Sequence, residues 1–192
     1  IIVSPAKEWD VIASEEPNIG KIATGYVLPL AALSAICAFI GYGIVGQSFF
    51  GYRYASINAG LIHAVIVLVT AFISVFLAAF VIDALAPSFG SEKNMNRSFQ
   101  LVAYSYTPAW LGGIFSILPS IAIIGSLFSL YSLYLLYVGL PKIKKTPQDK
   151  QVGYFVVSLL VLIVIYFLIG FILLKVLSPS YGYSTRIRYD YY

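Results

Sequence analysis

The chain contains five long apolar runs separated by short polar segments, and this pattern constrains its fold more than any other feature. The stretch from Ser98 to Pro141 contains no charged residue and is long enough to cross a bilayer twice. The hydrocarbon core of a membrane is about 30 Å thick, so a helix needs about 20 apolar residues to cross it. We therefore expect an all-α, polytopic membrane protein with five transmembrane helices and a short interfacial N-terminal helix.

The predicted spans take up most of the chain and leave room for a single membrane domain over residues 23–176. The five spans cover about residues 23–46, 61–86, 98–118, 120–140 and 153–174. Residues 1–22 are expected to form an amphipathic interfacial segment, and residues 177–192 a polar, Tyr-rich tail. Only 10% of the residues are charged, whereas soluble domains have about 25%.

Basic residues are shared unequally between the two predicted sides of the membrane. Eight lie on the N-terminal side: Lys7, Lys21, Lys93, Arg97, Lys142, Lys144, Lys145 and Lys150. Four lie on the other side: Arg53, Lys175, Arg186 and Arg188. Because Lys and Arg concentrate in cytoplasmic segments, this bias predicts a cytoplasmic N-terminus and an outer C-terminus. Their positions at span ends indicate helix anchoring and do not indicate nucleic-acid binding.

The segment before the first span reads as a short helix from about Pro5 to Ile12. Trp9 and Ile12 share one face of this helix, and charged residues occupy the others. Such a helix is expected to lie flat on the membrane surface, with Trp9 as its anchor. The alternative is a helix packed against the end of the bundle.

Asp83 is the acidic residue closest to the hydrocarbon. It falls in the last turn of the second span, where the helix dipole disfavours negative charge, so a compensating group is expected. Lys93 and Arg97 are the nearest candidates in the sequence. We expect a boundary aspartate that is hydrated or paired with one of them, and the alternative is a proton or cation site.

The third span carries a proline in its middle. Pro108 cannot donate to the carbonyl of Tyr104, so that carbonyl needs another partner. The hydroxyls of Tyr104, Ser105 and Thr107 lie in the same turn and could supply it. A kink is therefore expected at Pro108, and the alternative is a broken helix of the kind that forms ligand sites in transporters.

Small residues recur at every fourth position in two of the predicted spans. They are Ser105, Ala109 and Gly113 in the third span, and Gly125 and Ser129 in the fourth. This spacing lets helices approach closely. Close packing within the chain is expected, with homodimerisation through the same positions as the alternative.

The sequence lacks the combinations of residues that membrane enzymes use. It contains no HExxH or GxSxG motif. One His and one Cys do not make a usual metal site. We therefore expect no enzymatic activity, no cofactor and no metal.

Three segments carry a family resemblance. They run from Ile82 to Gly90, from Phe99 to Gly113 and from Tyr131 to Pro141. Together they resemble the Yip-one family of Rab/Ypt-interacting membrane proteins, and more closely its bacterial branch. The resemblance implies a five-span domain in the bacterial inner membrane, a cytoplasmic N-terminus, and association with itself or other membrane proteins. It implies no catalytic residue.

The function expected from these features is that of a non-enzymatic membrane adaptor or accessory subunit. Its partners would be the lipid bilayer and other membrane proteins in a homo- or hetero-oligomer. One alternative is a small-solute or ion transporter or channel that uses the Pro108 kink and Asp83. A further alternative is a membrane-shaping protein that inserts Trp9 into one leaflet.

Overall fold

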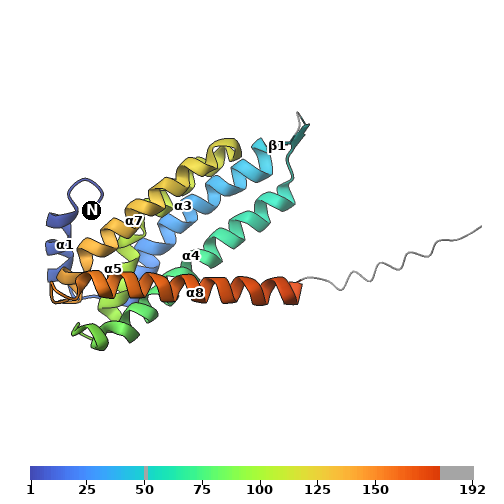
Figure 1. Cartoon of the computed structure of the whole chain (residues 1–192). Helices are drawn as coiled ribbons and strands as arrows, with labels where there is room; N and C mark the ends of the chain where they lie inside the picture. The colour runs from blue at the N-terminus through green and yellow to red at the C-terminus, as the bar shows by residue number, and fades with distance from the viewer. Residues whose placement is uncertain (50–51, 178–192) are drawn as a thin grey trace, which may run out of the picture.

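The computed structural model describes residues 1–49 and 52–177, which are mostly helical (Figure 1). The predicted tail, residues 177–192, lies outside this part except for its first residue. A short helix, α1 (Pro5–Ser14), comes first. The first apolar run then continues without a loop from Ile19 to Val45. Its consecutive pieces are α2 (Ile19–Ile22), the π-helical turn η1 (Ala23–Val27), α3 (Leu28–Phe39) and the π-helical turn η2 (Ile40–Val45).

A small antiparallel hairpin follows, which was not expected from the sequence. Its strands, β1 (Gln47–Phe49) and β2 (Tyr52–Tyr54), pair with Gln47 opposite Tyr54. The chain then enters α4 (Ile57–Leu85), the longest helix of the bundle, which ends in the 3-10 turn η3 (Ala86–Phe89).

The predicted third span is divided in the structure. It consists of α5 (Met95–Ser105), α6 (Thr107–Gly112) and the 3-10 turn η4 (Gly113–Ile117). A second 3-10 turn, η5 (Pro119–Ile121), leads into α7 (Ala122–Ile143), and α8 (Gln151–Leu177) ends the described chain.

Within the described residues, four helical segments are long and apolar enough to cross a membrane. They are Ile19–Val45, Ile57–Phe89, Pro119–Ile143 and Gln151–Ile169. The structure therefore has the helical architecture of a polytopic membrane protein. The third predicted span is absent from this set because its interruption leaves no single long helix.

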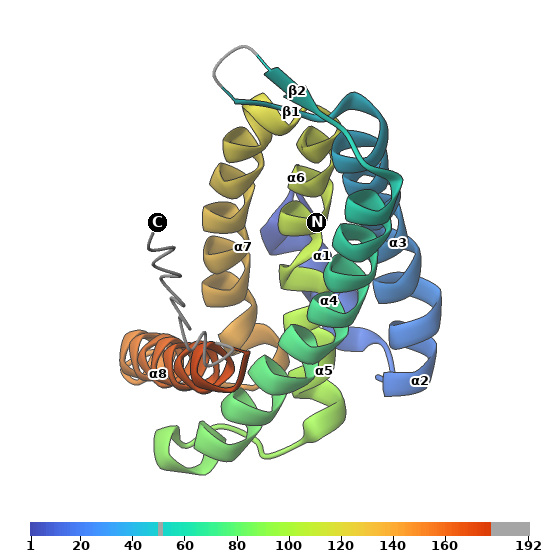
Figure 2. The ribbon, with the colours of Figure 1, turned by 90° about the vertical axis from the view of Figure 1, so that its right-hand side faces the viewer.

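Figures 1 and 2 show that α3, α4 and α7 run alongside one another, with α5 and α6 packed among them. Helix α1 lies at one end of this bundle, and the β1–β2 hairpin lies at the other (Figure 1). Helix α8 starts beside the end of α7 and then diverges from the bundle (Figure 1). Among its described side chains, Leu162 is the last buried one, and Ile165 is the last one packed against the core.

The large, fully buried side chains gather at the α1 end of the bundle. They include Trp9, Ile82, Phe99, Leu101, Leu140, Lys144 and Tyr154. Their elements are α1, the end of α4, α5, the end of α7 and the start of α8, so five separate parts of the chain meet there. This end therefore holds the core of the molecule.

Trp9 lies inside the protein, which corrects the expectation that it anchors the chain in lipid. Its side chain is 0% exposed, and Ile12 beside it is also buried. A Cβ on Gly139 of α7 would lie 2.7 Å from the indole ring, so the missing side chain there makes room for Trp9. Helix α1 therefore packs against the bundle end, as in the alternative interpretation.

Candidate functional site

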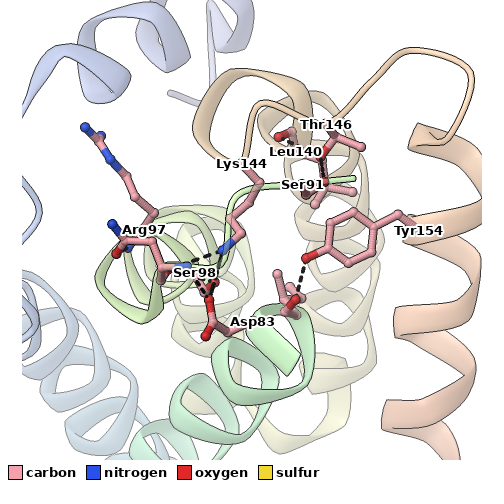
Figure 3. Close-up of polar contacts among 10 residues, drawn as sticks. Asp83, Ser91, Arg97, Ser98, Leu140, Lys144, Thr146 and Tyr154 are labelled. Atoms are coloured by element: carbon pink, nitrogen blue, oxygen red, sulfur yellow. Dashed lines mark hydrogen bonds and ion pairs between the residues drawn. The ribbon is translucent and has the colours of Figure 1, made fainter. Parts of the chain in front are cut away.

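The charged centre of the α1 end is a buried ion pair between Asp83 and Lys144 (Figure 3). The Lys144 ammonium lies 3.0 Å from Oδ1 of Asp83, and the two side chains are 0% and 11% exposed. Asp83 comes from the last turns of α4, and Lys144 follows the last residue of α7. The lysine supplies the positive charge that an aspartate near a helix C-terminus needs.

The hydrogen bonds around this pair use all three donors of the ammonium. Lys144 donates to Oδ1 of Asp83, to Oγ of Ser98 at 2.7 Å and to the carbonyl of Asn94 at 3.3 Å. Oδ1 of Asp83 also accepts from the backbone N–H of Asn94 at 2.7 Å and from Ser98 at 3.0 Å. The cluster thus joins α4, the start of α5 and the end of α7.

Burial and pairing shift the pKa of Lys144 in opposite directions. Burial lowers the pKa of its ammonium, and the nearby carboxylate of Asp83 raises it, with a net lowering. The charge of Lys144 in the interior therefore depends on Asp83.

Arg97 bonds to Ala13 and Gln100, and not to Asp83, the partner considered from the sequence. Its guanidinium donates to the carbonyl of Ala13 at 3.0 Å and to Oε1 of Gln100 at 3.2 Å. Gln100 in turn donates to the carbonyl of Ile12 at 3.1 Å. These bonds satisfy carbonyls at the C-terminus of α1, which a helix leaves open. Arg97 therefore fixes α1 to α5, and neither it nor Lys93 pairs with Asp83 in the described part of the chain.

Lys144 was missed as the partner of Asp83, although the sequence carries a signal for it. Leu136, Leu140 and Lys144 are spaced four residues apart, so they lie on one face of α7. The first two are buried apolar residues, which places Lys144 on the inward face. Lys142 and Lys145 lie off this face and form exposed ion pairs with Asp10 and Glu92.

Two further contacts lie beside the cluster, one from α8 and one between the segments that flank it. The Tyr154 hydroxyl donates to the carbonyl of Ile82, one residue before Asp83. Ser91 donates to Thr146 at 2.8 Å, which joins the segment before α5 to the segment after α7. Figure 3 shows Lys144 and Tyr154 reaching the end of α4 from different elements.

The interruption at Pro108 is satisfied locally, as the sequence predicts. The Tyr104 carbonyl, which Pro108 cannot serve, accepts from the Thr107 hydroxyl at 2.7 Å. The Tyr26 hydroxyl bonds to the same hydroxyl at 2.6 Å, and the rings of Tyr26 and Tyr104 lie 4.4 Å apart. The division is short, because Tyr106 alone separates α5 from α6.

The interruption is also bonded to α7. The backbone N–H of Ala109 donates to the Ser132 hydroxyl at 3.2 Å. Ser105 is 0% exposed, and its hydroxyl has no hydrogen-bond partner among the described residues. The polar groups near Pro108 are thus bonded partly within the segment and partly to Tyr26 and Ser132.

The small residues of the two predicted stripes make mostly internal contacts. A Cβ on Gly113 would lie 2.6 Å from Oγ of Ser34, and Gly125 meets the carbonyl of Gly112 at close range. Ser129 differs from the others because its side chain is exposed. These positions let α3, α6 and α7 approach one another within one chain.

No group of three or more His, Cys, Asp or Glu side chains in residues 1–49 and 52–177 is arranged to hold a metal ion. The described charged centre is an ion pair whose acid and base already bond to each other. Its hydrogen bonds connect α4, α5 and α7.

Comparisons with known proteins agree that this chain is similar to membrane proteins. A family model described as the Yip1 domain matches residues 1–172. The inner membrane protein YohC of Escherichia coli strain K12 is 26% identical over 188 residues, which cover 93% of each chain. YohC of Escherichia coli O6:H1 matches with the same identity and coverage. No solved structure gives a significant match.

Proposed function

Because this chain belongs to the Yip1-domain family, we propose that it is a non-enzymatic adaptor or accessory subunit of an inner-membrane complex. The chain would cross the bilayer five times, with its N-terminus in the cytoplasm. Both relatives compared above are described as inner membrane proteins, and this chain has apolar helices of the required length.

The divided segment α5–α6–η4 is the additional crossing in this proposal. Its parts contain 11, 6 and 5 residues, which corresponds to a length of about 35 Å. A bilayer core of about 30 Å fits this length. The hydroxyl and backbone contacts around Pro108 satisfy the polar groups that an interrupted helix would otherwise expose to lipid.

The distribution of basic residues supports the orientation. Lys7 and Lys21 lie in α1 and α2, Lys142 lies in the last turn of α7 beside Asp10 of α1, and Lys145 follows α7. Basic residues concentrate on the cytoplasmic side of membrane proteins. The α1 end, and with it the N-terminus, would therefore face the cytoplasm.

The adaptor proposal rests mainly on the Asp83–Lys144 cluster, in which the acid and the base bond to each other. All three donors of the ammonium bond within the protein, so the described contacts of this cluster link α4, α5 and α7. The outward faces of α4, α7 and α8 carry large exposed apolar side chains, such as Phe80, Ile123 and Phe167. These faces are suited to contact with lipid and with helices of partner proteins.

Co-purification tests this proposal directly. The full chain would be extracted from bacterial membranes in mild detergent, and its complexes analysed by native mass spectrometry. We expect a stable homo-oligomer or a stoichiometric membrane partner. Phe167→Ala on α8 and Ile123→Ala on α7 remove comparably exposed side chains from different faces, so loss of the complex in one variant locates the contact. A monomer without any partner would contradict the proposal.

A transporter or channel is the second candidate, and the interrupted helix at Pro108 favours it. Proteoliposomes containing the native chain would then show a solute or ion flux that Asp83→Asn abolishes and Pro108→Ala reduces. Absence of flux in the native protein would remove this candidate. Membrane shaping by Trp9 has less support, because the indole lies inside the bundle.

A further inference from the structure

A pocket with charges of both signs opens at the α1 end, apart from the Asp83 cluster. Its volume is about 320 Å³, near the lower end of the range for small-molecule sites, about 300–1,000 Å³. Its walls come from the segment after α1, from α2 and η1, and from α5. The charged and aromatic side chains of its lining are Glu15, Glu16, Lys21, Tyr26 and Tyr104.

The charged groups of this pocket are not used by the fold. In the part of the chain that the structure describes, Glu15, Glu16 and Lys21 have no ion-pair partner. All three are exposed at the pocket. By contrast, Asp10, Asp83 and Glu92 at the same end are all paired with lysines. The pocket therefore retains two negative charges and one positive charge for a ligand.

Two tyrosines supply the aromatic part of the lining. Tyr26 and Tyr104 are half-buried with their ring centroids 4.4 Å apart. The Tyr26 hydroxyl is bonded to Thr107, whereas the Tyr104 hydroxyl has no hydrogen-bond partner within residues 1–49 and 52–177. Aromatic faces attract cations, and this attraction adds to that of nearby carboxylates. The wall thus favours an ammonium group.

The pocket also lies at the level where lipid headgroups are expected. The first apolar helical segment begins at Ile19, so Glu15 and Glu16 precede it and Lys21 lies in its first turn. Tyrosine is enriched at this interfacial level of membrane proteins. A headgroup entering from the bilayer edge would meet all five side chains.

We propose that this pocket binds a phosphoethanolamine group, with the ammonium between the carboxylates and the tyrosine rings and the phosphate beside Lys21. Glu15 and Glu16 supply the two negative charges for the ammonium, and Lys21 supplies the positive charge for the phosphate. The ligand is either the headgroup of a phosphatidylethanolamine lipid or the free compound. This site is independent of the adaptor role proposed above.

The test uses the full chain in detergent, titrated with short-chain phosphatidylethanolamine, short-chain phosphatidylglycerol and soluble phosphoethanolamine. Phosphatidylglycerol carries the phosphate without the ammonium. Binding is measured by microscale thermophoresis for the native chain, the double variant Glu15→Gln/Glu16→Gln, Lys21→Gln and the control Glu8→Gln. Glu8 is exposed on α1 and does not line the pocket.

We expect binding of phosphatidylethanolamine, no comparable binding of phosphatidylglycerol, and an affinity about tenfold weaker in the double carboxylate variant. Lys21→Gln should also weaken binding, whereas Glu8→Gln should not. Tighter binding of the lipid than of the soluble compound assigns the ligand to the bilayer, and equal binding assigns it to the free compound. Binding that is absent, or unchanged in the double variant with an unaltered unfolding temperature, overturns the proposal.

Discussion

Lys144 is the buried cation that joins three parts of the described chain. Its side chain is fully buried, yet it is charged and bonds to three different residues. A buried pair is often no more stable than well-packed apolar residues, but removing one partner leaves an uncompensated charge. Replacing one partner should therefore cost much more stability than replacing both together.

Lys144→Met should destabilise the protein by about 3–5 kcal/mol, because Asp83 would remain buried without its counter-charge. The double variant Asp83→Asn/Lys144→Met should be more stable than Lys144→Met alone. Lys145→Met is the control, since Lys145 is 78% exposed in its pair with Glu92, and it should change stability by less than about 1 kcal/mol. Denaturant unfolding in detergent micelles measures all three, and equal losses for Lys144 and Lys145 would refute the role of burial.

Gly139 gives a second prediction at this scale. A Cβ there would lie 2.5 Å from Leu101 and 2.7 Å from Trp9, so Gly139→Ala should cost about 1–3 kcal/mol through overpacking. Trp9→Phe in the same chain should recover part of the loss. Gly25→Ala is the control because nothing lies within 4 Å of its Cβ. Thermal unfolding in detergent compares these variants, and a neutral Gly139→Ala would argue against the docking of α1.

The helices show what the sequence could and could not predict. Apolar runs predict the long helices because length and hydropathy are local properties. Pro108 predicts an irregularity because a proline removes a specific bond, but the expected form was a kink, whereas α5 and α6 are separate helices on either side of Tyr106. The partner of Asp83 is 61 residues away, so proximity in the sequence pointed to Lys93 and Arg97 instead. The indole of Trp9 suits both an interface and a core, and only the space above Gly139 decides between them.

The contact between the interrupted helix and α7 can be tested at the level of these elements. Ser132→Ala should destabilise the protein by about 1–2 kcal/mol, because the N–H of Ala109 would lose its acceptor next to Pro108. Ser129→Ala, three residues away on an exposed face, should have little effect. Chemical denaturation measures the difference, and equal effects would show that α7 does not satisfy the interruption.

For the whole molecule, the proposed five crossings place α1 and the hairpin on opposite sides of the membrane. The single cysteine, Cys37, is only 4% exposed, so it should give little background in thiol labelling. Glu8→Cys on α1 and Gln47→Cys in the hairpin introduce exposed sites at the two ends. A membrane-impermeant maleimide should label Gln47→Cys in intact spheroplasts and Glu8→Cys only after lysis. Labelling of both from the same side would contradict the crossing pattern.

The concentration of bonded charges and large buried side chains at one end has a mechanical consequence. We expect the end with the ion pair to be the more rigid one, because the far end is joined by the contact of Gly43 with Gly60 and by ring stacking between Tyr42 and His63. Separation of the helices within the bilayer would then be widest near the hairpin and smallest around Lys144. We therefore expect any opening of the bundle to begin at the hairpin end, which lies opposite the N-terminus.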